Sequence, residues 1–141
     1  GYTTDPNINP HYIRPAMLQQ RLQKIMDEYV GGVGTWYMTS KYMLEEGFYY
    51  LDLLKEDSYH MCAENLHELL RAWENFHRIL AGEAHARHIH FREETRYPGY
   101  YYRGDHLAID DENWKCFVNS TYDKESGEWD IFKREYHQLV P

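Results

Sequence analysis

The stretch NLHELLRAWENFHRILAGEA, residues 65–84, has the strongest helical periodicity in the sequence. Its apolar side chains recur at helical spacing with charged side chains between them, so it predicts a long amphipathic helix. The apolar stripe comprises Leu66, Leu69, Leu70, Trp73, Phe76, Leu80 and Ala84. A stripe of this kind normally faces the core of a globular protein. Ser58, a few residues upstream, is a suitable residue type to cap this helix.

Two more helices are predicted before this stretch. The first runs from Pro15 to about Val30, with Leu18, Leu22, Ile25, Met26 and Tyr29 at helical spacing. The second ends near residues 55–57 and carries Tyr37, Leu44, Phe48, Leu51 and Leu54 on one side. Three helices joined by short links predict an antiparallel bundle, so we expect a mainly α fold.

Two segments interrupt or precede these helices. Residues 1–16 contain Pro6, Pro10 and Pro15 and are expected to be extended, because the residue before a proline disfavours the helical conformation. The glycine-rich run at residues 31–34 follows a helix and lacks both GxGxxG and a Walker lysine. It therefore favours a helix break or a close contact between helices over a phosphate-binding loop.

The pattern changes after about Arg87. Residues 96–103 are aromatic and broken by Pro98-Gly99, which predicts an irregular segment. Residues 110–113 predict a turn. Residues 114–122 and 129–139 alternate as strands on either side of a turn at 123–127, which predicts a C-terminal β-hairpin. We expect an extended leading segment at 1–16 and a single helical domain with a terminal hairpin at 17–141.

Composition excludes several classes of protein. The net charge of −8 argues against a nucleic-acid or membrane-surface binder. No apolar run approaches the ~20 residues that a membrane span requires, and residues 1–6 do not resemble a signal peptide. The two cysteines, Cys62 and Cys116, are far apart. They predict free thiols in a reducing cytoplasm, not a disulfide framework or an iron–sulfur cluster.

Histidines at positions 85, 88 and 90 form the densest group of potential metal ligands. Zinc sites on a helix favour HxxxH, and His85 with His88 fits that spacing only loosely. The sequence therefore gives little support to a small metal-dependent enzyme built on His85, His88 and His90. General acid–base chemistry is also disfavoured, because no serine or cysteine nucleophile and no paired carboxylates stand beside these residues.

Arginines and tyrosines cluster just beyond the third helix, in a protein that is otherwise acidic. The cluster contains Arg87, Arg92, Arg96, Arg103, Tyr97, Tyr100, Tyr101 and Tyr102. Guanidinium groups bind anions and stack on aromatic rings, so a ligand edge is one interpretation. Arginine and tyrosine are also enriched at interfaces, and 16% aromatic residues exceed what a three-helix bundle can bury. We favour an interdomain contact through Arg87, Arg92, Arg96, Tyr97 and Arg103.

Several motifs resemble one family. They are RLQKIMDEY at 21–29, NLHELLRAW at 65–73, EAHARH at 83–88, FREETRYPGYYYR at 91–103 and WKCFV at 114–118. In order and spacing these segments resemble the C-terminal region of the dissimilatory adenylylsulfate reductase alpha subunits. More weakly, REETR at 92–96, RGD at 103–105 and DDENW at 110–114 resemble the C-terminal domain of succinate dehydrogenase and fumarate reductase flavoproteins. The resemblance extends from about residue 17 to the C-terminus.

The resemblance implies a helical domain of an FAD-dependent oxidoreductase that reduces adenylylsulfate to sulfite and AMP, or runs the reverse reaction. In that family FAD is held mainly by an N-terminal domain, and a beta subunit carries two [4Fe–4S] clusters. The implied partners are therefore the FAD-binding domain of the same subunit and the iron–sulfur beta subunit. No catalytic, cofactor-binding or metal residue of the family has a position in these 141 residues, so we expect no activity from this chain alone.

One alternative is a stand-alone interaction module derived from that domain, with its aromatic surface turned to another partner. The upstream reading frame would decide between the two.

Overall fold

The computed structural model describes residues 12–139. Most of the predicted leading segment, residues 1–11, lies outside this range. Tyr12 to Arg14 run up to the first helix, and Ile13 forms a parallel bridge with Met61. The Cys62 amide donates to the Ile13 carbonyl over 3.0 Å, and Arg14 forms an ion pair with Glu64. The start of the first helix and the start of the third are thus fastened together at one end of the bundle.

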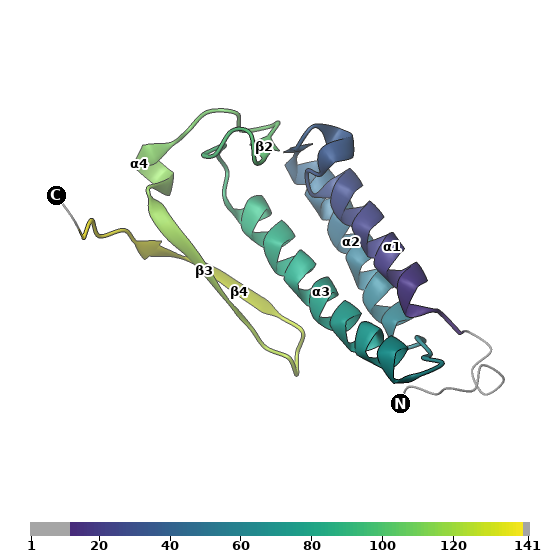
Figure 1. Ribbon diagram of the computed structural model, residues 1–141. Coiled ribbons are helices and arrows are strands. Elements are labelled where there is room, and N and C mark those ends of the chain that lie inside the picture. The colour runs from purple at the N-terminus through teal and green to yellow at the C-terminus, as the bar shows by residue number, and fades with distance from the viewer. Residues whose placement is uncertain (1–11, 140–141) are drawn as a thin grey trace.

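Three helices form the body of the protein. They are α1 (Pro15–Tyr29), α2 (Lys41–Ser58) and α3 (Leu66–Phe91). Sequential neighbours run in opposite directions, and both α1 and α2 pack against α3 (Figure 1). This arrangement confirms the predicted mainly-α fold. Within residues 12–139, no helix is both long and apolar enough to cross a membrane.

The helix ends show which capping predictions hold. Pro15 occupies the first turn of α1, as expected. Ser58 does not cap α3: it is the last residue of α2, and its hydroxyl donates to the Lys55 carbonyl over 2.6 Å. The cap of α3 is Asn65, whose side-chain oxygen accepts from the Glu68 amide at 3.0 Å. Asparagine is as suitable a capping residue as serine, and the chain between α2 and α3 places Asn65 at the start of α3.

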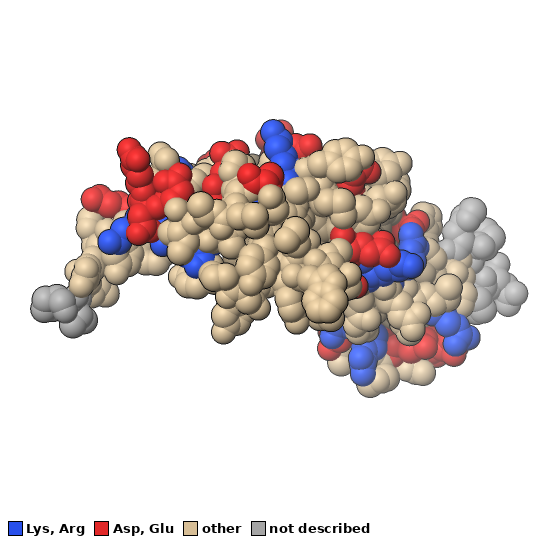
Figure 2. Space-filling model, turned by 90° about the horizontal axis from the view of Figure 1, so that it is seen from above, with Lys and Arg blue, Asp and Glu red and all other residues tan. Residues whose placement is uncertain are grey.

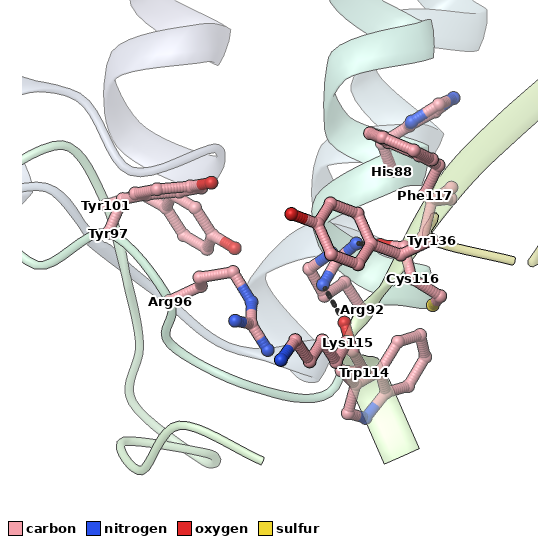
Figure 3. A pocket seen from close by; sticks show the side chains of 11 residues that line it. His88, Arg92, Arg96, Tyr97, Tyr101, Trp114, Lys115, Cys116, Phe117 and Tyr136 are labelled. Carbon is pink, nitrogen blue, oxygen red and sulfur yellow. Dashed lines mark hydrogen bonds between the residues drawn. The ribbon is translucent and has the colours of Figure 1, made fainter. Parts of the chain in front are cut away.

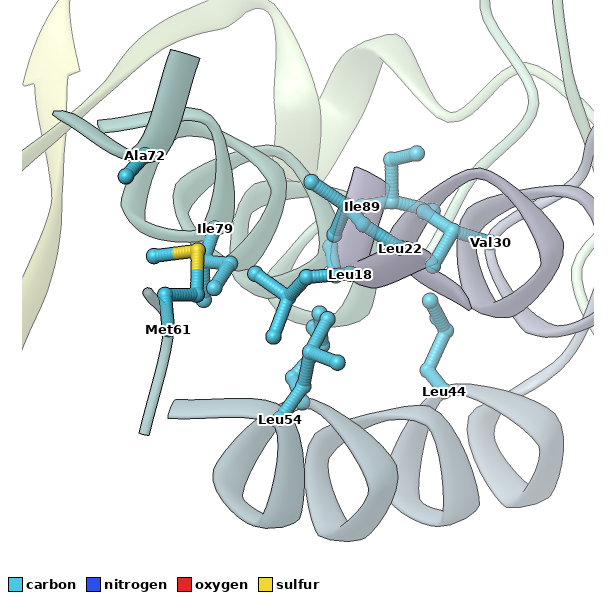
Figure 4. Close-up of a cluster of buried hydrophobic side chains, with 11 residues drawn as sticks. Leu18, Leu22, Val30, Leu44, Leu54, Met61, Ala72, Ile79 and Ile89 are labelled. Atoms are coloured by element: carbon cyan, nitrogen blue, oxygen red, sulfur yellow. The ribbon is translucent and has the colours of Figure 1, made fainter. Parts of the chain in front are cut away.

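The core lies where the three helices meet (Figure 4). Leucines dominate the contributions of α1 and α2, whereas α3 contributes smaller side chains. The buried cluster contains Leu18, Leu22, Val30, Leu44, Leu51, Leu54, Met61, Ala72, Ile79, Ala86 and Ile89. Leu44, Leu51 and Leu54 confirm the predicted face of α2, with Phe48 partly buried beside them. Tyr37 precedes α2 and is exposed, so its assignment to that face was wrong.

The predicted core face of α3 was also wrong. Leu66, Leu70 and Trp73 are 83%, 56% and 61% exposed. The buried face instead carries Ala72, Asn75, Ile79, Glu83, Ala86 and Ile89. Alanines let the neighbouring helices approach closely, and the two polar side chains find partners inside the protein. Asn75 donates to the Pro15 carbonyl at 2.7 Å, and Glu83 forms ion pairs with Lys55 and Arg87.

Because the buried face of α3 differs from the predicted one, two substitutions on this helix should affect the free energy of unfolding very differently. Ile79→Ala removes a buried side chain and should lower the free energy of unfolding by about 2–5 kcal/mol. Trp73→Ala removes the larger side chain from an exposed site and should change it by only about 0.5 kcal/mol or less. Urea denaturation of the 141-residue chain measures both. A larger loss from Trp73→Ala than from Ile79→Ala would show that the apolar stripe is the core face after all.

The glycine-rich run ends α1, which confirms the predicted helix break. Gly31 has φ +84°, in the left-handed region that favours glycine. Gly32 and Gly34 wrap around the carboxylate of Asp27, which accepts from the Gly34 amide at 2.9 Å. A Cβ on Gly32 would lie 2.3 Å from Asp27 Oδ1, so a side chain does not fit there. A single 3₁₀ turn, η1 (Val33–Thr35), then leads to the short strand β1 (Met38–Thr39).

The C-terminal part begins later than predicted, because α3 continues past Arg87 to Phe91. An irregular segment follows, as expected, and contains β2 (Tyr102–Arg103), which pairs in parallel with β1. The predicted turn at 110–113 is a short helix, α4 (Asp111–Trp114), capped by Asp110. β3 (Cys116–Tyr122) and β4 (Trp129–Glu135) then form the predicted antiparallel hairpin beside α3 (Figure 1). β4 ends four residues before the predicted limit at Leu139.

Candidate functional site

Arg103 lies at the centre of the segment that follows α3. Its guanidinium is buried, and Nη1 donates to the carbonyls of Ile89, His90 and Arg92 at 2.6–3.0 Å. Nε and Nη2 donate to the two carboxylate oxygens of Asp105, each at 2.9 Å. The last carbonyls of a helix have no partners within the helix, and here a cation supplies them. Arg103 therefore supplies hydrogen-bond donors to the carbonyl groups at the C-terminal end of α3.

Glu94 is the second centre of the same segment. Its carboxylate is buried and accepts from Arg92, from Arg96 through two nitrogens, and from the Asp110 amide. Arg96 also reaches Asp111 at 2.8 Å. The Arg92 guanidinium also donates hydrogen bonds to the carbonyls of Trp114 and Cys116, at 2.9 and 2.8 Å. One buried carboxylate thus joins the end of α3 to α4 and to the start of β3.

These two networks unite the three motifs behind the weaker family resemblance. Residues 92–96, 103–105 and 110–114 are separated in sequence, yet their charged groups meet around Arg103 and Glu94. The contacts around Arg103 and Glu94 explain the spacing of the three motifs. Together, the three motifs determine the path of the chain from the end of α3 to the hairpin of β3 and β4.

The same networks predict how stability depends on pH. Burial acts to raise the pKa of Glu94, but hydrogen bonds from Arg96, Asp110 and Arg92 outweigh it and lower that pKa. Hydrogen bonds from Arg103 likewise hold the pKa of Asp105 well below its usual range. A carboxylate whose pKa is lower in the folded state than in the unfolded state stabilises the fold at pH values above its unfolded-state pKa. This stabilisation is lost as the pH falls through the folded-state pKa.

We therefore expect the free energy of unfolding to fall steadily as the pH drops below about 4, the range in which unfolded carboxylates titrate. Urea denaturation of the chain between pH 7 and pH 2 measures this loss. The double variant Glu94→Gln/Asp105→Asn should show a shallower dependence on pH. An identical slope in the double variant would show that these two carboxylates do not carry the effect.

A cleft of about 480 Å³ opens beside the Glu94 network. We call it the Arg–Tyr cleft. Its lining consists of His88, Arg92, Arg96, Tyr97, Tyr101, Trp114, Lys115, Cys116, Phe117, Val118 and Tyr136. Tyr97 and Tyr101 stand on one side of it, Phe117 and Tyr136 stand on the other, and basic groups lie between them (Figure 3). It is therefore a cleft with aromatic walls and cationic groups at its base.

The rings and cations of the cleft also contact one another. The Arg92 guanidinium lies 5.7 Å from the Trp114 ring centroid, and Lys115 Nζ lies 5.9 Å from that of Tyr136. Burial raises the pKa of the Tyr101 phenol, which keeps it a hydrogen-bond donor at neutral pH. Cationic groups next to aromatic rings suit an anionic or carboxylate-bearing group.

The structure separates the five residues predicted for interdomain contact. Arg92, Arg96 and Tyr97 line the Arg–Tyr cleft. Arg87 lies apart from it, paired with Glu83 at 2.8 Å and stacked over Phe48 at 4.8 Å. Arg103 is buried within the chain, so it can affect another domain only through the segment that it holds. Contact with another domain remains a prediction for all five.

The three histidines do not converge on one point. His88 Nε2 lies 2.9 Å from the Ser120 hydroxyl of β3, and His90 Nε2 lies 3.4 Å from Glu45 of α2. His85 lies on the exposed side of α3. Among residues 12–139, no group of three or more His, Cys, Asp and Glu side chains could hold a metal ion. Partial burial and the nearby Arg92 lower the pKa of His88, so the imidazole is mainly neutral at pH 7.

Several residues of the site were missed by the sequence reasoning. Glu94 was noted only within the family motifs at 91–103 and 92–96, although the alternation of acid and base in REETR could have indicated a compact ion-pair cluster. Lys115 and Phe117 were assigned to a strand and to the family motif at 114–118, and not to a site. Tyr136 has no sequence signal, since the hairpin alone brings it to the cleft.

Comparison with solved structures defines the class of fold. No protein-family model matches the chain. The structure of the Mycobacterium smegmatis Sdh1 complex in the apo form contains this fold, with a TM-score of 0.69 over 94% of this chain and 22% of that one. At 21% sequence identity, this likeness shows the fold alone.

Much closer similarity is found to adenylylsulfate reductase. The alpha subunit from Megalodesulfovibrio gigas is 54% identical over all 141 residues, which cover 21% of that protein. The reductase structure from Archaeoglobus fulgidus matches with a TM-score of 0.92 and 50% identity, over 99% of this chain and 22% of that one. A structure of adenosine-5-phosphosulfate reductase in a covalent adduct with sulfite matches equally well.

The chain is thus a relative of the adenylylsulfate reductase alpha subunit, and it matches the C-terminal portion of that subunit. This confirms the resemblance seen in the sequence motifs. The chain spans about a fifth of the length of the relatives it matches.

Proposed function

We propose that these 141 residues form the C-terminal helical domain of an adenylylsulfate reductase alpha subunit. In this proposal the domain packs on the FAD-binding part of the same subunit and supports the reduction of adenylylsulfate to sulfite and AMP, or the reverse reaction. The observation that carries the proposal is the 54% identity to the Megalodesulfovibrio gigas subunit along the whole chain.

The glycine-rich run at residues 31–34 does not support FAD binding by this domain. A dinucleotide site needs a glycine-rich loop whose amides are free to face phosphate. In the described part of the chain, the run at 31–34 is closed around the Asp27 carboxylate, which occupies the Gly34 amide and would repel phosphate. Two separate cysteines also cannot supply the four thiolates of a typical [4Fe–4S] cluster. FAD therefore belongs to the rest of the alpha subunit in this proposal, and the clusters to the beta subunit.

The surface of the domain supports a packing role. Large apolar side chains are exposed on several elements, including Trp36, Leu66, Trp73, Tyr97 and Tyr100. Seen from above, uncharged side chains cover much of the middle of this face, while acidic groups lie toward both ends and along the upper edge (Figure 2). Exposed large apolar side chains such as these commonly mark an interface. The same observation favours the second candidate, a stand-alone interaction module, if the chain is not joined to a flavoprotein.

A chimaera tests the proposal. In the Megalodesulfovibrio gigas alpha subunit, the matching C-terminal portion is replaced by this chain, and the beta subunit is co-expressed. We expect an FAD-containing complex that reduces adenylylsulfate, whereas the subunit whose C-terminal portion is deleted without replacement should still bind FAD but should not reduce adenylylsulfate. A chimaera that folds and binds FAD but behaves in every respect like the deletion would contradict the proposal.

A further inference from the structure

We propose that the Arg–Tyr cleft receives an acidic side chain on a segment of the alpha subunit that lies outside these 141 residues. The inference rests on the proposed function and deepens it, because it names the chemistry of the contact. The occupant is a peptide segment of the same subunit with an aspartate or glutamate, held by Arg96 and Lys115 and enclosed by the tyrosines of the cleft.

The charge of the cleft is the first argument. Its lining contains Arg92, Arg96 and Lys115 and no acidic residue, in a protein of net charge −8. Glu94 and Asp111 lie behind the lining and pair with the two arginines. Three cationic groups against two carboxylates leave one positive charge. A single carboxylate would balance this charge, whereas a phosphate dianion would exceed it.

Unused donors are the second argument. All the hydrogen bonds of Arg96 within residues 12–139 come from Nε and Nη2, which leaves the Nη1 donors without a partner there. Over the same residues, Lys115 Nζ has the Tyr136 ring as its neighbour and no hydrogen-bond acceptor. Both side chains point into the cleft (Figure 3). A carboxylate between them would accept from both.

The walls favour a peptide over a small anion. Tyr97, Phe117 and Tyr136 are 62%, 49% and 42% exposed, although they stand around one cleft. A volume of about 480 Å³ holds a few side chains, and a lone inorganic anion would leave these rings in water. Burying such rings around a central charged contact is typical of the energetic centre of a protein interface.

Carbodiimide cross-linking of the assembled chimaera tests this directly, because the reagent joins an amine to a carboxylate in contact with it. We expect mass spectrometry to find Lys115 joined to an aspartate or glutamate of the alpha subunit outside these 141 residues. Cross-links from Lys115 only to residues within this chain, only to the beta subunit, or to nothing would each overturn the inference.

A charge reversal supplies an independent readout. Lys115→Glu in the 141-residue chain should weaken its binding to the rest of the alpha subunit roughly tenfold, the value of one charged hydrogen bond. Lys124→Glu makes the same change of charge in the hairpin turn and should leave binding unchanged. Circular dichroism of both variants verifies folding. Equal affinities for the two variants would contradict the inference.

The two proposals fail in different ways. If the chimaera assembles and reduces adenylylsulfate but Lys115 stays uncross-linked and as reactive to acetylation as in the isolated chain, the cleft is open and only this inference is wrong. If the chimaera folds and binds FAD yet acts like the deletion, the proposed function itself is wrong. Inorganic phosphate that protects Lys115 from acetylation in the isolated chain, while the assembled enzyme gives no cross-link, would assign the cleft to a small anion instead.

Discussion

Replacing Arg103 with methionine should lower the free energy of unfolding by about 3–5 kcal/mol, the loss typical of breaking a buried ion pair. The substitution keeps an unbranched side chain but removes every donor. Asp105 then loses the guanidinium that pairs with both of its oxygens, and three carbonyls at the end of α3 lose their partner. Urea denaturation of the 141-residue chain measures the effect.

Arg71→Met is the matched control, because Arg71 lies on α3 and is exposed. We expect it to change the free energy of unfolding by about 0.5 kcal/mol or less. Hydrogen exchange should also localise the damage in Arg103→Met, with faster exchange in the last turn of α3 and in residues 102–106. A loss no larger than that of Arg71→Met would show that the guanidinium does not hold this segment.

Replacing Glu94 with alanine should also cost about 3–5 kcal/mol, because it leaves two arginines facing each other without their shared carboxylate. The Asp110 amide loses its acceptor in the same step. Since Arg92 also holds the start of β3, we expect the hairpin to loosen from α3.

Glu93→Ala tests whether position or charge matters, since Glu93 is the exposed neighbour. It removes the same charge and should have little effect on stability. Fluorescence of Trp114, which packs edge-to-face against Phe91, should change in Glu94→Ala and stay as it is in Glu93→Ala. Equal stability losses in the two variants would contradict the role assigned to the buried carboxylate.

Helix positions could be predicted from this sequence because they depend on local spacing. The faces of α1 and α2 followed from their leucines, and the hairpin followed from alternation around a turn. The face of α3 could not be predicted in this way. Its buried side carries Asn75 and Glu83, whose partners Pro15, Lys55 and Arg87 come from three different helices. A hydropathy pattern counts these two residues as surface and the exposed Leu66 and Trp73 as core.

The site was partly predictable for a similar reason. Arginines near tyrosines indicated where to look, and Arg92, Arg96 and Tyr97 do line one cleft. Sequence could not distinguish a guanidinium that faces solvent from one buried under its own loop, as Arg103 is. Whether Arg103 is buried depends on the pairing of β1 with β2, which joins residues more than sixty positions apart in the sequence. Lys115 and Tyr136 became part of the site only through the register of the hairpin.

Sedimentation velocity shows whether this domain associates with the rest of the alpha subunit. The 141-residue chain is mixed with a Megalodesulfovibrio gigas alpha subunit that lacks its matching C-terminal portion and whose bound FAD gives a separate absorbance signal. We predict one species that carries the flavin and the added mass of this chain in a 1:1 ratio. Two species that sediment independently at micromolar concentration, with a folded flavin-bearing subunit and a folded chain, would contradict it.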